Sequence, residues 1–175
     1  WGKDLRFWMR FPTRQGEVVT VKTAVSAVSS DGAKLNMQEL EGKTFASLKA
    51  EGEKLWEGQL SKFKIEATPE QRETFYTSVY HAFLHPFIFQ DADGKFRELD
   101  KNIGQAEGFT NYTVFSLWDT YRALHPLFNL VQRDINADIV NSMLAHYDKS
   151  VEHMLPVWSF YGNEPWCMIG YHGAS

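Results

Sequence analysis

The residue pattern changes abruptly near position 44, and this change constrains the fold more than any other feature of the sequence. Residues 5–11 and 18–26 largely alternate apolar and polar side chains and are rich in aromatic and β-branched residues, as strands are. From Thr44 onward the apolar residues instead recur with a helical period, namely Phe45, Leu48, Leu55, Trp56, Leu60 and Phe63. Strands followed by a run of helices predict an α+β arrangement or two consecutive domains.

The first forty residues are interpreted as β structure. Turn residues at 13–16, ending in Gly16, separate the two alternating runs, so a hairpin is expected. An isolated hairpin is only marginally stable in water, and these strands therefore require a larger sheet.

The rest of the chain is predicted to be mainly helical. Thr68-Pro69-Glu70-Gln71 has a capping residue, a first-turn proline and the glutamine of a capping box. Further helices are expected at about 119–132, at about 134–149 with Asp134 as N-cap, and from Pro165 onward.

Irregular structure is expected between these helices, at 91–94 and 95–113. Asp91-Ala92-Asp93-Gly94 predicts a turn. It resembles a calcium loop only faintly, because the downstream acidic ligands are not at the required spacing.

Composition excludes several classes of function. The net charge is −4, and no run of Lys or Arg provides the basic patch that a nucleic-acid-binding protein needs. No apolar stretch approaches the roughly 20 residues of a membrane span. A single cysteine excludes an internal disulfide and a multi-thiolate zinc site. The chain starts at Trp1 and stops within an expected helix, so we interpret it as an excerpt.

Residues 115–122 form the first group that could carry chemistry. In a helix beginning here, Asp119 and Arg122 would share one face near the N-terminus. Such a pair offers acceptors and donors to vicinal sugar hydroxyls, and the neighbouring Trp118 can support a pyranose ring. A purely structural role, with Asp119 capping the helix and pairing with Arg122, explains the same charges.

Residues 158–172 form the second group, in which aromatic residues surround a Gly162-Asn163 turn. A helix from Pro165 would place Glu164 at its positive end, beside converging backbone N–H groups and aromatic faces, as in a pocket wall. The alternative is an aromatic loop packed onto helices.

Two residues of the second group, Cys167 and His172, have common structural explanations. Cys167 has no base at a spacing that would make it a nucleophile, so a buried small residue is expected. His172, taken alone, is more typical of a structural histidine.

Several runs, taken in order, resemble glycoside hydrolase family 92, the calcium-dependent exo-α-mannosidases. The matching runs are GEVVTVKTAVSAVSSDGAKLN at 16–36, FYTSVYHAFLHP at 75–86, DADGKF at 91–96, FSLWDTYRALHPL at 115–127 and GNEPWCMIGYH at 162–172. Together they span nearly the whole chain and are much more specific than any one of them.

The resemblance implies an α+β multidomain excerpt, with the end of an N-terminal β-sandwich followed by the first helices of an (α/α)6 barrel. Residues 1–40 would be the C-terminal strands of the sandwich, and 41–66 a linking helical region. Residues 67–175 would be the opening helices of an incomplete catalytic barrel.

Members of this family hydrolyse terminal α-linked mannose with inversion and calcium assistance, using a Glu as general acid and Asp residues as general base. Their acid, base and calcium motifs lie later in the chain, so the resemblance assigns no catalytic residue and no metal ligand here. At the positions that match the family's motifs, the resemblance implies residues that form the walls of the mannose-binding subsite. These are Trp118, Asp119, Arg122, Trp166, Cys167 and His172. Glu164 does not match the acid motif.

Glycoside hydrolysis usually needs two carboxylates, and their pairing cannot be read from spacing alone. The candidates in loops or at helix starts are Asp91, Asp93, Glu107, Asp119 and Glu164. Asn111-Tyr112-Thr113 matches a glycosylation sequon, a triplet that is common by chance.

The partners implied by the resemblance are mannose-containing glycans, with α-1,2 linkages favoured, and the remainder of the same polypeptide. It also implies a secreted, periplasmic or cell-surface location. The isolated chain is expected to be inactive. Two alternatives stay open, a non-catalytic mannose-binding protein and a structural fragment whose aromatic residues are all core.

Overall fold

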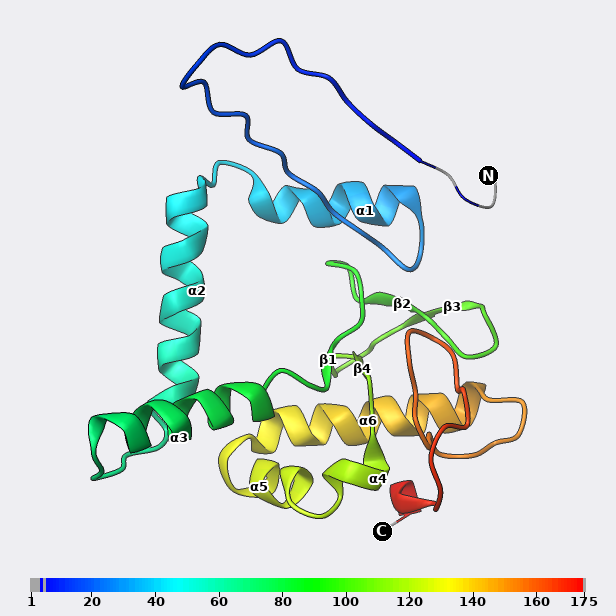
Figure 1. Ribbon diagram of the computed structural model, residues 1–175. Helices are drawn as coiled ribbons and strands as arrows, with labels where there is room; N and C mark the ends of the chain where they lie inside the picture. Colours follow the sequence, from blue (N-terminus) through cyan, green and yellow to red (C-terminus); the bar gives the residue numbers. More distant parts are fainter. Residues whose placement is uncertain (1–3, 5, 175) are drawn as a thin grey trace.

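The long helix α6 (Arg133–Lys149) is the element around which the core forms (Figure 1). The computed structural model describes residues 4 and 6–174. α6 packs against α5 (Leu124–Val131) and against the short strand β4 (Tyr112–Thr113). The buried core cluster consists of Tyr112, Phe115, Leu117, Phe128 and Ile139.

Two predicted helices are confirmed, α2 (Phe45–Leu60) and α3 (Pro69–Ala82). The capping box of α3 is complete, since the Thr68 N–H donates to Gln71 Oε1 over 3.1 Å and the Gln71 N–H donates to Thr68 Oγ1 over 3.4 Å. Each helix start therefore follows from local capping chemistry.

The expected loop over 95–113 contains short strands instead. β2 (Lys95–Arg97) pairs antiparallel with β3 (Ile103–Gln105), and β1 (Phe87–Ile88) pairs antiparallel with β4. These strands of two or three residues carry too little sequence for an alternation to be recognised.

The predicted turn before β2 is confirmed. The Gly94 N–H donates to the Asp91 carbonyl over 2.8 Å, and Gly94 has a φ of 81°. A residue without a Cβ adopts this left-handed conformation at no steric cost.

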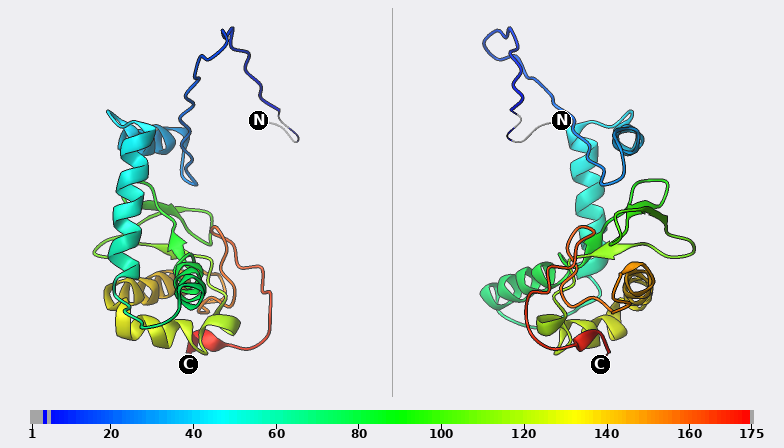
Figure 2. Two further views of the ribbon diagram at one scale, coloured as in Figure 1. Left: turned by 60° about the vertical axis from the view of Figure 1, so that its left-hand side comes forward. Right: turned by 90° about the vertical axis from the view of Figure 1, so that its right-hand side faces the viewer.

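The strand prediction for residues 1–40 is not realised in the described part of that segment. Residues 6–28 form no strand, whereas α1 (Ser30–Met37) and the short 3-10 helix η1 (Gln38–Leu40) follow them. Leu5, the first residue of the predicted hairpin, lies outside the described residues. The first part of this segment extends away from the other elements (Figure 2), so its alternating residues have no neighbouring strand to pair with in the described chain. Its last residues return to the fold, where Ser26 donates to Asp91 and the Ala27 carbonyl accepts from Arg97.

The helices of the last third differ from the prediction in three ways. The helix expected at about 119–132 is divided into α4 (Leu117–Thr120) and α5. The helix expected at about 134–149 is confirmed as α6, but its N-cap is Gln132 rather than Asp134.

No α-helix follows Pro165 in the residues described up to Ala174, so the third prediction is wrong. Trp166, Met168 and Gly170 have φ values of 54°, 73° and 87°. This repeated left-handed backbone is incompatible with a right-handed helix. The 3-10 turn η2 (His172–Ala174) is the element that follows within the described residues.

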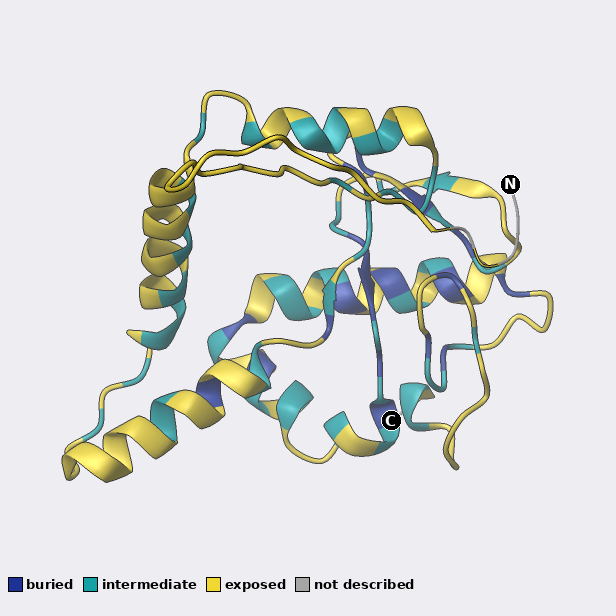
Figure 3. Ribbon diagram, turned by 45° about the horizontal axis from the view of Figure 1, so that its top comes forward, coloured by how far each residue is buried: buried dark blue, intermediate teal, exposed yellow. Residues whose placement is uncertain are grey.

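Most residues of the N-terminal segment and of α2 are exposed (Figure 3), and several of them are large and apolar. Phe7 is 84% exposed, Val18 86% and Phe45 81%. Burial is concentrated around α6 and the segments that cross it.

Candidate functional site

Trp118 and Asp119 lie in α4, directly after a buried segment of the core. Phe115 is 0% exposed and Leu117 2%, and both share the core cluster with Ile139 of α6. Because these buried apolar side chains hold the backbone in place, they also fix where Trp118 and Asp119 leave it.

Arg122 is positioned by aromatic rings. Its guanidinium carbon lies 5.4 Å from the centroid of the Trp118 ring and 4.9 Å from that of Tyr121. Asp119 accepts a hydrogen bond from the Ser116 hydroxyl, and no ion pair joins it to Arg122 among the described residues. Ser116 is the N-cap of α4 and no side chain caps it, so the purely structural pairing and capping of Asp119 are not formed.

His172 joins this cluster through Tyr121. The two rings are parallel, with an interplanar angle of 4° and centroids 4.1 Å apart. The short helix η2 that carries His172 packs against α4. The two groups recognised in the sequence, 115–122 and 158–172, therefore meet at this point.

Trp166 and Cys167 lie on the loop between α6 and η2. Trp166 is 46% exposed and lines a separate cavity of about 270 Å³ with Lys101 and Glu164. Cys167 is an exposed free thiol, so the prediction of a buried small residue is wrong. No hydrogen bond found in the described part of the chain joins either residue to the α4 cluster.

Glu164 organises this loop instead of sitting at a helix start. Its carboxylate accepts backbone N–H bonds from Val157 at 2.9 Å, from Trp158 at 3.0 and 3.1 Å, and from Trp166 at 3.0 Å. An ionised carboxylate is well suited to gather several N–H donors. The predicted dipole role is therefore replaced by a structural one.

The same loop is docked on the segment before α4. The Ser159 carbonyl accepts from the N–H groups of Val114 and Phe115, at 3.1 and 3.2 Å. The Trp158 indole N–H donates to Ser116 Oγ over 2.7 Å. These partners are 42 or more residues apart, so spacing in the sequence gave no signal for Ser116 or Trp158 as site residues.

His146 of α6 contacts both the docked loop and the segment before α4. Its Nε2 lies 3.3 Å from Ser159 Oγ, and its ring meets Phe115 edge-on, with centroids 6.0 Å apart. Burial away from water lowers the pKa of His146 to about 4, so the ring is neutral at pH 7. Burial also lowers the pKa of His125, and the hydrogen bond that its Nδ1–H donates to Asn136 Oδ1 acts in the opposite direction.

An aromatic cavity of about 480 Å³ borders this docked segment. Ser116 and Trp158 contribute to its wall from the two docked segments. The other lining residues are His81, Ala82, His85, Phe87, Val114, Thr120, Leu124, Phe160 and Tyr161. Aromatic faces beside a few hydroxyl and imidazole groups are suited to a polar ring such as a sugar.

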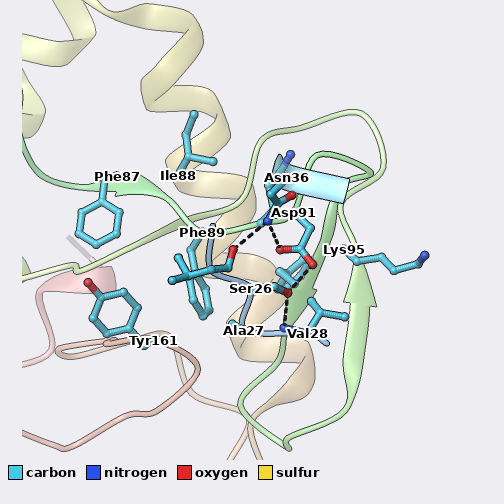
Figure 4. A pocket seen from close by; sticks show the side chains of 13 residues that line it. Ser26, Ala27, Val28, Asn36, Phe87, Ile88, Phe89, Asp91, Lys95 and Tyr161 are labelled. Atoms are coloured by element: carbon cyan, nitrogen blue, oxygen red, sulfur yellow. Dashed lines mark hydrogen bonds between the residues drawn. The ribbon is translucent and has the colours of Figure 1, made fainter. Parts of the chain in front are cut away.

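Asp91, the first of the candidate carboxylates, has a structural role. It is 4% exposed and accepts from Ser26 Oγ at 2.6 Å and from Asn36 Nδ2 at 2.8 Å (Figure 4). Asn36 Oδ1 in turn accepts from the Ala92 N–H over 2.8 Å. This network fastens α1 to the turn before β2, at the edge of a cavity of about 460 Å³.

The remaining candidates are engaged locally or exposed. Asp93 pairs with Lys95 at 2.6 Å, which holds its pKa below the ordinary value, and Glu107 is exposed. Within the part of the chain that the structure describes, no three His, Cys, Asp or Glu residues are placed to hold a metal ion. Asn111 is fully buried and donates to the Phe89 carbonyl over 2.8 Å, so the sequon is closed to a glycan in the folded chain.

Comparison with known proteins places this arrangement in a family. The model of the glycosyl hydrolase family 92 catalytic domain matches residues 32–175. The solved GH92 alpha-mannosidase BT3965 from Bacteroides thetaiotaomicron is 74% identical, with a TM-score of 0.83, and the match covers 84% of this chain and 20% of that chain. The same relative has been solved in complex with mannoimidazole, at the same identity and TM-score, with 84% of this chain and 19% of that chain covered.

A more distant structure agrees with this match. The GH92 inverting mannosidase BT2199 from Bacteroides thetaiotaomicron VPI-5482 is 27% identical, with a TM-score of 0.76, covering 85% of this chain and 20% of that chain. The chain thus spans about a fifth of the length of these relatives. A comparison with curated protein sequences found no match. No helix in the described residues is long and apolar enough to cross a membrane.

With a family model that extends over most of its length, the chain belongs to glycosyl hydrolase family 92, within the catalytic domain.

Proposed function

We propose that the full-length protein is an exo-acting α-mannosidase that releases terminal α-1,2-linked mannose from glycans with inversion of configuration. The observation that carries the proposal is 74% identity to a solved α-mannosidase over 84% of this chain. The mannoimidazole complex of that relative supports a mannose-type ligand, and the inverting relative supports the stereochemical course.

In this proposal the segment supplies walls of the mannose-binding subsite. The Asp119 carboxylate accepts from sugar hydroxyls, the Arg122 guanidinium donates to them, and Trp118 bounds the ring. His172 completes this wall from η2. Trp166 and Cys167 are assigned to its outer part, on the adjoining loop.

The catalytic carboxylates are assigned to other parts of the full-length protein. Inverting glycosidases hold two carboxyl groups about 6.5–9.5 Å apart, with a water molecule between one of them and the sugar. Asp91 and Glu164 are committed to structural hydrogen bonds. Neither is free to occupy such a position.

Calcium assistance is proposed with ligands outside this segment. Ca²⁺ requires several hard oxygen ligands, and the family resemblance puts the calcium motif later in the full-length protein. When bound, the ion would supply coordination to sugar oxygens. This chain's residues would orient the rest of the ring.

The wider architecture and location are also part of the proposal. Residues 1–40 would end an N-terminal β-sandwich, 41–66 would link, and 67–175 would open an (α/α)6 barrel. The exposed apolar N-terminal segment, including Phe7 and Val18, fits a partner sheet in the full-length protein. A secreted, periplasmic or cell-surface location fits an enzyme that acts on glycans.

The direct test is mannose release by the full-length protein from α-1,2-linked mannobiose, with the anomer of the product followed by NMR. Chelator-sensitive release of β-mannose is expected. A folded protein that binds mannose without releasing it would favour the non-catalytic alternative, and α-mannose as the first product would exclude inversion.

A further inference from the structure

A continuous chain of hydrogen bonds links the C-terminal loop to α4. The Trp158 indole N–H donates to Ser116 Oγ over 2.7 Å, and the Ser116 hydroxyl donates to Asp119 Oδ2. The three residues come from two segments that are about forty positions apart in the sequence.

The indole group of Trp158 fixes the donor-to-acceptor direction of this series of hydrogen bonds. An indole nitrogen can only donate, so Ser116 Oγ must accept from Trp158. The single hydroxyl proton of Ser116 is then directed to the Asp119 carboxylate, which accepts only. One oxygen of Asp119 is thereby held, and the other is left for a ligand hydroxyl.

Trp158, the donor, is held in place by two sets of contacts. The Trp158 backbone N–H is bound by the Glu164 carboxylate, and the next residue, Ser159, contacts both the segment before α4 and His146. Asp119 by contrast is exposed and has no ion pair in the described part of the chain. Its orientation therefore depends on Ser116.

From this geometry we propose that Trp158 and Ser116 are positioning residues that orient the Asp119 carboxylate toward a sugar hydroxyl. The inference rests on the proposed function and adds two residues to it that do not themselves have to touch the sugar. A preoriented carboxylate binds a hydroxyl without first losing side-chain entropy, which favours the bound state.

The test uses kcat/KM for mannoside hydrolysis and the affinity for mannoimidazole, both measured on the full-length protein. Trp158→Phe keeps an aromatic ring but removes the N–H, and Ser116→Ala removes the hydroxyl. Each is expected to lower both quantities about tenfold, the effect of one lost hydrogen bond. Ser116→Thr, which restores the hydroxyl, should recover most of the loss.

A double-mutant cycle separates positioning from packing. In an Asp119→Ala background, Trp158→Phe should change either quantity less than about twofold, because the group it orients is gone. The matched control is Trp56→Phe, which replaces a tryptophan whose ring packs at a tilt against Tyr80 of α3 and should behave like wild type.

Each result has one meaning. An active wild type with unaffected Trp158→Phe, or an equal loss in the Asp119→Ala background, overturns the positioning role and leaves the proposed function standing. A folded wild type that neither hydrolyses mannosides nor binds mannoimidazole overturns the proposed function and this inference with it.

Discussion

At the scale of single residues, Asp119 and Arg122 form no ion pair with any residue that the structure describes. Arg122 stacks on two rings and Asp119 accepts one hydroxyl, so neither neutralises the other. The sequence predicts a helix that would place both side chains on one face. The structure differs, because α4 ends at Thr120 and Arg122 lies beyond it. It did not predict Ser116 or Trp158, whose contact depends on how a distant loop docks.

Asp119→Ala in the full-length protein should lower kcat/KM for mannosides. Loss of a hydrogen bond to a charged group is worth about 1.5–3 kcal/mol, or roughly 10- to 150-fold. Thermal unfolding should shift little, since exposed substitutions change stability by about 0.5 kcal/mol or less. Asp134→Ala, at an exposed position in α6, is the matched control. A drop in stability with no specific loss of sugar affinity would support a structural role instead.

His146 should make the folded protein sensitive to acid. Its pKa is lowered from 6.5 to about 4 by burial, so below pH 6.5 the unfolded chain binds a proton that the folded chain does not. Stability contributed by the neutral ring is full above pH 6.5 and falls by about 1.4 kcal/mol per pH unit toward pH 4, roughly 3 kcal/mol in all.

The measurement is the thermal unfolding midpoint of the full-length protein between pH 7 and pH 4.5. His146→Gln should flatten its decline, whereas His81→Gln, at an exposed histidine, should follow wild type. Parallel curves for wild type and His146→Gln would contradict the role assigned to burial at this position.

At the scale of elements, local chemistry decided which predictions succeeded. The start of α3 was predicted because its capping box lies within four consecutive residues. The helix from Pro165 was wrong because the Glu164 carboxylate draws the N–H groups of Val157, Trp158 and Trp166 into an irregular loop. That arrangement depends on tertiary contacts that no local pattern encodes.

Thr68→Ala should destabilise the N-terminus of α3. Loss of an N-cap side chain costs about 0.5–2 kcal/mol. Thr74→Ala, at an exposed position within the same helix, should be neutral or slightly stabilising, since alanine is the better helix former. The stability change of each variant is measured by denaturant unfolding, with hydrogen exchange of the α3 amides as the local readout. Equal effects of the two substitutions would contradict the capping role.

The substitution Glu164→Gln distinguishes a structural role of the Glu164 carboxylate in the loop from a role as general acid. The amide loses charge-assisted bonds to backbone N–H groups, at a cost of about 1.5–3 kcal/mol in stability. The fold-loss in kcat should be similar for mannosides with good and poor leaving groups. A large loss confined to poor leaving groups, with stability unchanged, would instead identify Glu164 as a general acid.

At the scale of the whole molecule, the order of elements was predicted only in part. The helical half is present, but the alternating residues before α1 form no strand in the described segment, because strands depend on partners that are distant in sequence or on another sheet. α1 was missed, although Ser29 caps it by accepting from the Gly32 N–H over 3.0 Å. The strand-like alternation of residues 18–26 ends just before this cap and favours β structure for the whole region.

The central claim is that this segment forms part of the mannose-binding wall of a family 92 mannosidase. The most direct measurement is a crystal structure of the full-length protein with mannoimidazole bound. We expect Asp119 to lie within hydrogen-bond distance of a ligand hydroxyl, about 2.5–3.0 Å, with Trp118, Arg122 and His172 around it. A ligand bound elsewhere, with α4 and the 158–172 loop making no contact to it, would contradict the claim.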